Sequence, residues 1–246
     1  MSFFQVSCAA ASITRYAGPE DRACGAARSH VNIHNMSDSD HRRGPHGRRG
    51  YHHGNLREAL IRGALDLIAE KGPAGFTIAD AARLAGVSSA APYRHFRDRE
   101  ALMADVALLG FNKLADRLDK AWNEGRPGIM RAYENIGREY LAFAREEPAL
   151  YAAMFEAGIP ASSTPELRQA SDRAFEILRN ASEAICAILP ESRRPPALMV
   201  ALHVWALSHG IASLFGRKGA RKTPMSPEDL LEAAVLVYLQ GLGIET

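Results

Sequence analysis

The sequence has few cysteines, and their spacing serves neither a metal site nor a disulfide framework. Only three occur in 246 residues: Cys8, Cys24 and Cys186. Paired Cys-x-x-Cys spacings, which structural zinc sites commonly use, do not occur. The scarcity argues against a disulfide-stapled secreted domain and favours a reducing cytoplasm, with Cys186 as a small core residue.

The sequence also lacks an uninterrupted apolar run long enough to span a bilayer. The longest candidate, residues 196–215, is broken by His203, Ser208 and His209. The N-terminus has no basic start followed by an apolar stretch, so we expect no secretory signal. We therefore predict burial of residues 196–215 in a protein core and no membrane partner.

Strand-like alternation and glycine-rich phosphate loops are not found, so a nucleotide-binding α/β fold is not expected. No Ser–His–Asp set, Cys–His set, carboxylate pair or metal cluster can be assembled from motif spacing. We predict a protein that is not an enzyme, without a cofactor or metal. Turnover lost in His209→Ala would revive the enzyme hypothesis.

What the sequence does contain is helical periodicity, and its most informative stretch is TIADAARLAGVSSAAPYRHF at residues 77–96. Thr77 and Asp80 form a capping-box pattern at the start of one short helix. Gly86 suits a turn, because positive φ costs glycine little. Ser88 is a good N-cap for a second helix. Helix, glycine-containing turn and helix is the pattern of a helix-turn-helix DNA-binding unit.

A helix is expected on each side of this unit. Asn55 and Glu58 mark the start of the preceding helix. Asp98 opens the following helix, which we expect to run towards Trp122. Four apolar residues of that helix are expected to pack inward: Leu102, Val106, Leu109 and Leu114.

The order of these pieces at residues 55–102 resembles the tetracycline-repressor (TetR) family of bacterial transcription regulators. In order, the segment contains a long amphipathic helix, the sequence KGPAGFTI, a second helix, the sequence AGVS, a third helix, the sequence YRHF, and DREAL at the start of the next helix. WALSHG, at residues 205–210, is similar to the Trp–His–Gly (WHG) pattern of one subgroup. The resemblance implies an all-α fold, with a three-helix helix-turn-helix DNA-binding domain at residues 51–100. It also implies a larger helical ligand-binding and dimerisation domain at 101–246. Residues 1–35 show neither helical nor strand periodicity, so we expect residues 1–50 to be a disordered tail with a basic arm.

The resemblance also implies which side chains face DNA. Ser89, Ala90 and Ala91 fall where family members read base edges, and Ser88 precedes them. None is a long bidentate donor, although Ala can contact a thymine methyl. Phosphate contacts are implied at four positions: Thr77, Tyr93, His95 and Arg99. We therefore infer that contacts with the phosphate backbone of DNA supply most of the affinity for DNA.

A basic arm, HRRGPHGRRGYHHGNLR, precedes the first helix at residues 41–57 and includes Arg48 and Arg49. Gly and Pro prevent a stable helix there. Such an arm can neutralise phosphates or enter a minor groove, and a solvated linker is the alternative. Deleting the chain up to Arg49 is expected to weaken operator binding and flatten its salt dependence. Translation from Met36 is a further hypothesis, which the intact mass from the native host would decide.

The C-terminal half supplies candidates for a ligand pocket. Trp205 and His209 lie four residues apart and share a helix face. They either line a pocket or form a buried, hydrogen-bonded pair. Further pocket candidates could equally belong to the core: Tyr133, Tyr151, Met154, Phe155 and Phe175. We expect a small apolar or aromatic effector.

The last two helices, about residues 196–217 and 227–242, carry small residues at helical spacing. Four of these residues are candidates for a dimer interface: Ala206, Gly210, Ala234 and Gly241. In the TetR family this helix pair joins its copy in a four-helix interface, and a two-fold protein reads two half-sites. Internal core is the alternative for both helices.

These observations predict a cytoplasmic, DNA-binding transcriptional regulator. We expect a ligand-responsive repressor that binds a palindromic double-stranded operator as a homodimer. The alternative is a helical ligand-binding or scaffold protein without specific DNA recognition, because the recognition helix is alanine-rich. A non-specific nucleoid-type binder is a further alternative, and it would bind random DNA nearly as tightly as any selected site.

Overall fold

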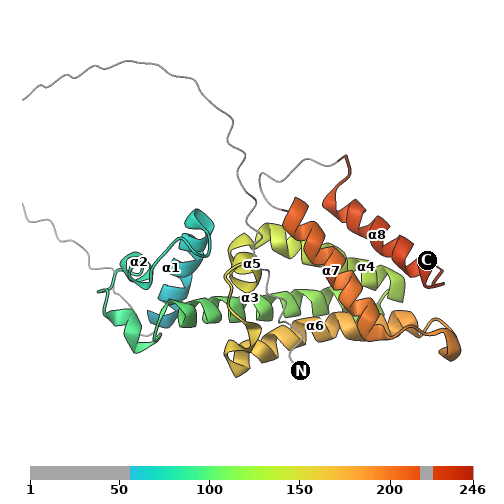
Figure 1. Ribbon diagram of the computed structural model, residues 1–246, viewed down its shortest axis with the longest axis horizontal. Helices are drawn as coiled ribbons and strands as arrows, with labels where there is room; N and C mark the ends of the chain where they lie inside the picture. Colours follow the sequence, from blue (N-terminus) through green and yellow to red (C-terminus); the bar gives the residue numbers. More distant parts are fainter. Residues whose placement is uncertain (1–55, 217–223, 246) are drawn as a thin grey trace, which may run out of the picture. The chain divides into compact units, whose positions relative to one another are not determined.

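The computed structural model describes residues 56–216 and 224–245, and these two ranges contain helices and no strand (Figure 1). The predicted all-α fold class is confirmed for them. The N-terminal elements are α1 (Leu56–Lys71), α2 (Ile78–Leu84), the 3-10 helix η1 (Ala91–Arg94) and α3 (Arg99–Trp122). The others are α4 (Ile129–Glu146), α5 (Pro148–Phe155), α6 (Pro165–Cys186), α7 (Ala197–Phe215) and α8 (Pro227–Gly241). Short 3-10 helices occur at Asn123–Gly125, Ala161–Ser163 and Glu191–Arg193.

The predicted tail and the basic arm up to Asn55, with Met36, Arg48 and Arg49, lie outside the described residues. Arg57, the last arginine of the arm, lies in the first turn of α1 and binds Asp105 at 2.6 Å, so this end of the predicted arm is helical. The hypotheses about DNA contact by the arm and about the translation start therefore stay predictions.

The N-terminal head, residues 56–98, closes around the apolar face of α1. Leu60 and Leu67 are buried on this helix, which contacts α2, η1 and α3. Phe76, before α2, and Phe96, after η1, are 4% and 3% exposed. The two phenylalanines therefore anchor the irregular segments that flank the helix-turn-helix to the same core.

Helix α3 links the head to the rest of the described chain. It begins after the N-cap Asp98, whose Oδ1 accepts a hydrogen bond from the Ala101 N–H at 2.8 Å. It contacts α1 as well as α4, α5 and α6. The predicted domain boundary at residue 100 thus falls in its first turn.

Packing on α3 follows the sequence at three of four predicted positions. Leu102, Val106 and Leu114 are buried, but Leu109 is 44% exposed, so its predicted burial is wrong. Gly110 lets α5 approach closely, because a Cβ there would lie 2.6 Å from the Met154 Sδ.

The C-terminal helices pack in a chain of neighbours. Helix α6 lies along α3, α7 packs on α6 and α4, and α8 packs on α7 and α4. Figure 1 shows α7 and α8 side by side. By length and composition alone, helix α7 could cross a membrane. In the structure, 33% of its most apolar 18-residue stretch is buried within the chain.

Candidate DNA-binding surface and ligand cavity

The start of α2 is fixed by the predicted capping box. The Asp80 N–H donates to the Thr77 hydroxyl oxygen at 3.2 Å, and the Thr77 N–H donates to the Asp80 carboxylate at 2.9 Å. The backbone hydrogen bond from Thr77 lowers the pKa of Asp80, and the Thr77 hydroxyl adds to the effect. Gly86 has a φ of +70°, the left-handed conformation expected at the turn.

The second element of the motif differs from its predicted form. Instead of an α-helix capped by Ser88, the chain makes the four-residue 3-10 helix η1, preceded by Ala90 without a side-chain cap. The Ser88 carbonyl accepts from the Ala91 N–H, three residues on, at 3.0 Å. The reason is Pro92, which stands four residues after Ser88 and has no N–H to donate.

Most predicted DNA contacts lie on one short exposed stretch. Ser88, Ser89, Ala90 and His95 are exposed, and Ala91 is half-buried. Tyr93 is 58% exposed although its neighbour Pro92 is fully buried. Pro92 therefore anchors η1 to the core while the side chains around it face outward.

Arg99 is held inside the head. Its Nη2 donates to the Pro73 carbonyl, and its guanidinium lies 4.9 Å from the centroid of the Phe76 ring. This geometry braces the loop between α1 and α2 on the first turn of α3. The predicted phosphate contact at Arg99 thus depends on guanidinium N–H groups beyond the one that binds Pro73.

A cavity of about 30 Å³ lies among α3, α4, α5, α6 and α7. Four predicted ligand residues line it: Tyr133, Phe155, Phe175 and Trp205. Apolar side chains that sequence reasoning left in the general core complete much of the wall: Phe111, Leu114, Ile136, Leu178 and Val204. The helical spacing of these residues indicates only that they are buried. Residues of a cavity wall and residues of a filled core are both buried, so spacing does not distinguish them.

His209, Tyr151 and Met154 do not line this cavity. The His209 Nδ1 lies 2.9 Å from the Tyr140 hydroxyl and 3.0 Å from the Tyr151 hydroxyl. Trp205 stacks on His209, with ring centroids 5.5 Å apart. His209 thus braces the cavity residues Trp205 and Tyr140 from outside the wall, while Met154 packs against Gly110.

Burial sets the protonation of this cluster, which we call the aromatic brace: Tyr140, Tyr151, Phe155, Trp205 and His209. Desolvation lowers the pKa of His209, and the nearby carboxylate of Glu156 opposes the shift. Desolvation also raises the pKa of Tyr140 well above its usual value. A neutral His209 whose Nδ1 accepts from a tyrosine hydroxyl fits both directions.

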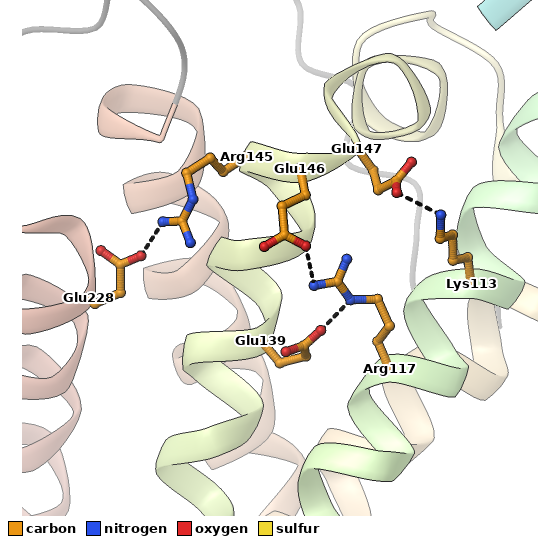
Figure 2. A network of polar contacts seen from close by, with 7 residues as sticks. All are labelled: Lys113, Arg117, Glu139, Arg145, Glu146, Glu147 and Glu228. Atoms are coloured by element: carbon orange, nitrogen blue, oxygen red, sulfur yellow. Dashed lines mark hydrogen bonds and ion pairs between the residues drawn. The ribbon is translucent and has the colours of Figure 1, made fainter.

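Ion pairs connect α3, α4, α5 and α8 (Figure 2). Arg117 of α3 binds Glu139 and Glu146 of α4, and Lys113 binds Glu147, beside the start of α5, at 2.6 Å. Arg145 of α4 binds Glu228 of α8. Burial is the largest single influence and raises the pKa of Glu228, but the hydrogen bond from Arg145, a backbone hydrogen bond and the charges of Arg145 and Arg138 together outweigh it and lower the pKa. The ion pairs of Arg117 thus connect the surface of α4 to α3, the helix that enters the head.

The predicted dimer residues lie on a partly exposed face of α7 and α8. Ala206 and Gly241 are exposed, and Gly210 and Ala234 are half-buried. A Cβ built at Gly210 or Gly241 would meet no atom within 4 Å. Two large apolar side chains of these helices are strongly exposed: Leu214 (65%) and Val237 (68%).

Comparison with protein families gives two matches that together span most of the described chain. Residues 60–106 match the model for bacterial regulatory proteins of the tetR family. Residues 133–238 match the tetracyclin repressor-like C-terminal domain. The WHG subgroup is not confirmed and stays a prediction. A comparison with curated proteins gave no match.

Solved structures share the fold. A Rhodococcus sp. RHA1 protein of unknown function is 28% identical, with a TM-score of 0.66 over 78% of this chain and 98% of that one. The TetR family transcriptional regulator PfmR of Thermus thermophilus is 23% identical (TM-score 0.56), over 74% of this chain and 97% of that one. A TetR-family regulator of Bordetella parapertussis is 19% identical (TM-score 0.57), over 78% of this chain and 99% of that one.

The head, its helix-turn-helix and the two family matches agree on one assignment. The family consists of regulators rather than enzymes, and ligand response and dimerisation are typical of it. The chain belongs to the TetR family and is a DNA-binding transcriptional regulator.

Proposed function

We propose that this regulator is a cytoplasmic, ligand-responsive repressor that binds a palindromic operator as a homodimer. The observation that carries the proposal is the exposed stretch around η1, held on a head whose core is closed behind it. Ser88, Ser89 and Ala90 would face base edges, and Tyr93 and His95 would contact phosphates. Because these side chains offer little bidentate readout, thymine methyls and DNA shape would supply much of the specificity.

The homodimer is supported by the outer face of α7 and α8. Small residues at Ala206 and Gly210 leave room for a second helix to approach, and Leu214 and Val237 expose apolar area beside them. Burying this area against a second copy would remove it from water at roughly 25 cal/mol per Å². A two-fold pair of heads would then read two half-sites.

The cavity supports a ligand-responsive mechanism. Its wall is apolar and aromatic, and no charged side chain of the described residues contributes to it. An uncharged apolar or aromatic effector fits such a wall, because a buried charge without a partner is costly. Phe111 on α3 and Phe155 on α5 both line the cavity, and α3 and α5 both contact α1 of the head.

Effector binding would therefore act on the head through two routes. Helix α3 begins in the head, and α5 packs against α1 of the head. A ligand that binds one arrangement of these helices more tightly would shift the population towards it and change operator affinity. The ion pairs of Arg117 and Lys113 would make α4 and the start of α5 move together with α3.

Binding to a fragment of the gene's own upstream region tests the proposal, with random DNA of equal length as control, at two salt concentrations. We expect specific binding and a palindromic footprint that two protomers occupy. Equal and steeply salt-dependent binding to both DNAs would contradict specific autoregulation and favour a non-specific binder. Deleting the chain up to Arg49 is expected to flatten the salt slope, and an unchanged slope would refute the role of the arm.

A further inference from the structure

Arg94 is the last residue of η1, and its side chain is exposed. The phosphate contacts that the family resemblance implies lie on either side of it, at Tyr93 and His95. The residues that the resemblance places at base edges, 89–91, have short side chains. Arg94 is the residue of η1 that carries a guanidinium, so it is the long, charged hydrogen-bond donor of the DNA-facing stretch.

The guanidinium of Arg94 has no hydrogen bond or ion pair within residues 56–216 and 224–245. Five other arginines, in the head and at the start of α3, each have a polar partner: Arg57 with Asp105, Arg62 with Glu58, Arg83 with Asp80, Arg97 with Asp98, and Arg99 with the Pro73 carbonyl. Arginine has five N–H donors and no acceptor. All the donors of Arg94 are therefore available to a group from outside the head.

The geometry of η1 turns Arg94 away from the core. A 3-10 helix has three residues per turn, so Pro92, Tyr93 and Arg94 point in three directions, roughly 120° apart. Pro92 is fully buried and points inward. Tyr93 and Arg94, which are both exposed, therefore project to the two sides of the line along which η1 rests on the head. Ala91 shares a side with Arg94, because residues three positions apart eclipse one another in this helix type.

The size of η1 places these side chains inside a major groove. In a helix-turn-helix, the second element inserts into the major groove, which is about 12 Å wide. The four residues of η1 span roughly 8 Å, at about 2.0 Å per residue, so the element fits within the groove in any orientation. A side chain that begins on η1 therefore begins between the phosphate walls. The side chain of Arg94 is long enough to extend from there to the base edges.

We propose that Arg94 reads a guanine in each half-site of the operator. Two N–H groups of its guanidinium donate to the O6 and N7 acceptors of one guanine, a pairing that the planar fork of arginine matches. Arg94 is thus a specificity-determining residue, and it adds a hydrogen-bonded base to a stretch that otherwise offers methyl and hydroxyl contacts. This assignment rests on the proposed binding of a palindromic operator and names a base that the operator contains.

Selection of operators from a random DNA pool locates this guanine. Full-length wild type and Arg94→Ala are selected in parallel, with Arg97→Ala as the control. Arg97 is also exposed and lies three residues further on, but it pairs with Asp98 at 2.9 Å. We expect the wild-type and Arg97→Ala motifs to contain a guanine at a symmetric position in each half-site. The Arg94→Ala motif should keep the other positions and lose the preference at this one.

Affinities for defined operators measure the size of the effect. Exchanging the G·C pair for A·T in one half-site should weaken wild-type binding about tenfold or more in fluorescence anisotropy. The same exchange should change the affinity of Arg94→Ala by less than about twofold. Arg94→Gln should prefer the A·T operator, because glutamine pairs with the N6 and N7 atoms of adenine. Both Arg94 variants should melt at the wild-type temperature, since Arg94 has no partner in the described chain to lose.

Three results would overturn this role. The first is a phosphate contact at Arg94: Arg94→Ala would then keep the wild-type motif, weaken binding to all sequences by one factor and reduce the slope of log affinity against log salt by about 0.9. The others are a wild-type motif without a guanine in its half-sites and a lower melting temperature of Arg94→Ala. All three leave the proposed function intact, whereas failure of the wild type to enrich any motif contradicts both.

Discussion

The head and the C-terminal helices both use local helix caps, but they differ in their side-chain hydrogen bonds, which join distant parts of the chain inside the C-terminal helices. In the head, polar side chains close local turns: Thr77 and Asp80 cap α2, and Asp98 caps α3. In the C-terminal part, polar groups meet inside the core across long sequence separations. Tyr140 and His209 are 69 residues apart, and Tyr133 bonds Ser182 across 49 residues at 2.9 Å.

The difference follows from what each part has to do. A head that presents a fixed surface to DNA needs rigid turns, and contacts between residues that are close in the sequence hold these turns in place. A core that responds to a ligand needs contacts between elements that can shift relative to one another. We therefore expect mutations in the head to change DNA affinity directly, and mutations in the core to change stability and ligand response.

The largest expected effect is on core packing. Phe143 is 0% exposed, so Phe143→Ala should lower the free energy of unfolding by about 3–5 kcal/mol. Urea denaturation measures this change, with Leu109→Ala on the exposed side of α3 as the control, expected within about 0.5 kcal/mol. Equal losses in the two variants would contradict the assigned packing.

The next effect separates DNA binding from stability. Tyr93→Ala should weaken operator binding about tenfold, or about 1.4 kcal/mol, and leave the urea midpoint unchanged. The reason is that Tyr93 is mostly exposed beside the buried Pro92. Fluorescence anisotropy with operator DNA measures the affinity. An unchanged affinity would remove Tyr93 from the DNA surface.

A matched pair of caps sharpens the comparison further. Thr77 caps α2 and Thr164 caps α6, each through its hydroxyl oxygen. Replacing either by Ala should cost about 1 kcal/mol of stability. Only Thr77→Ala should also weaken operator binding, since only this cap sets the motif and stands at a predicted phosphate contact. Equal DNA affinities of the two variants would argue against that role.

The smallest effect is a pH dependence that arises in the aromatic brace. Because burial lowers the pKa of His209 in the folded state, the unfolded chain binds more protons below about pH 6.5. This group's contribution to stability is therefore lost as pH falls from about 6.5 towards the folded pKa. Thermal melts from about pH 7.5 to about pH 5 should show a shallower decline for His209→Gln than for the wild type. Identical slopes would contradict a half-buried, neutral imidazole at His209.

The sequence predicts well wherever structure depends on near neighbours. Thr77, Asp98, Thr164 and Ser226 were identifiable as helix caps because the residues they bind lie three positions away. Ser88 failed as a cap for an equally local reason, which is the missing N–H of Pro92. Without that N–H, the chain cannot make the bond from residue 92 to the Ser88 carbonyl with which an α-helix capped by Ser88 would begin.

Other features depend on contacts that spacing cannot reveal. Helical periodicity predicts that Tyr140 faces the core, but not that its hydroxyl meets the His209 Nδ1. Likewise, no sequence pattern marks Gly137, which lines two cavities. Leu109 was expected to pack, yet the helices that cover its neighbours leave it exposed. The spacing of apolar residues predicts which side chains are buried, whereas the residues that they contact depend on how the helices pack.

Selection of operators from a random DNA pool tests the central claim most directly, because it needs no knowledge of the regulated genes or the effector. Full-length wild-type protein and Tyr93→Ala would be selected in parallel. We predict that the wild type enriches a palindromic motif and that Tyr93→Ala binds this motif more weakly than the wild type. Failure of the wild type to enrich any motif would contradict a sequence-specific regulator and favour a helical protein that has lost DNA recognition.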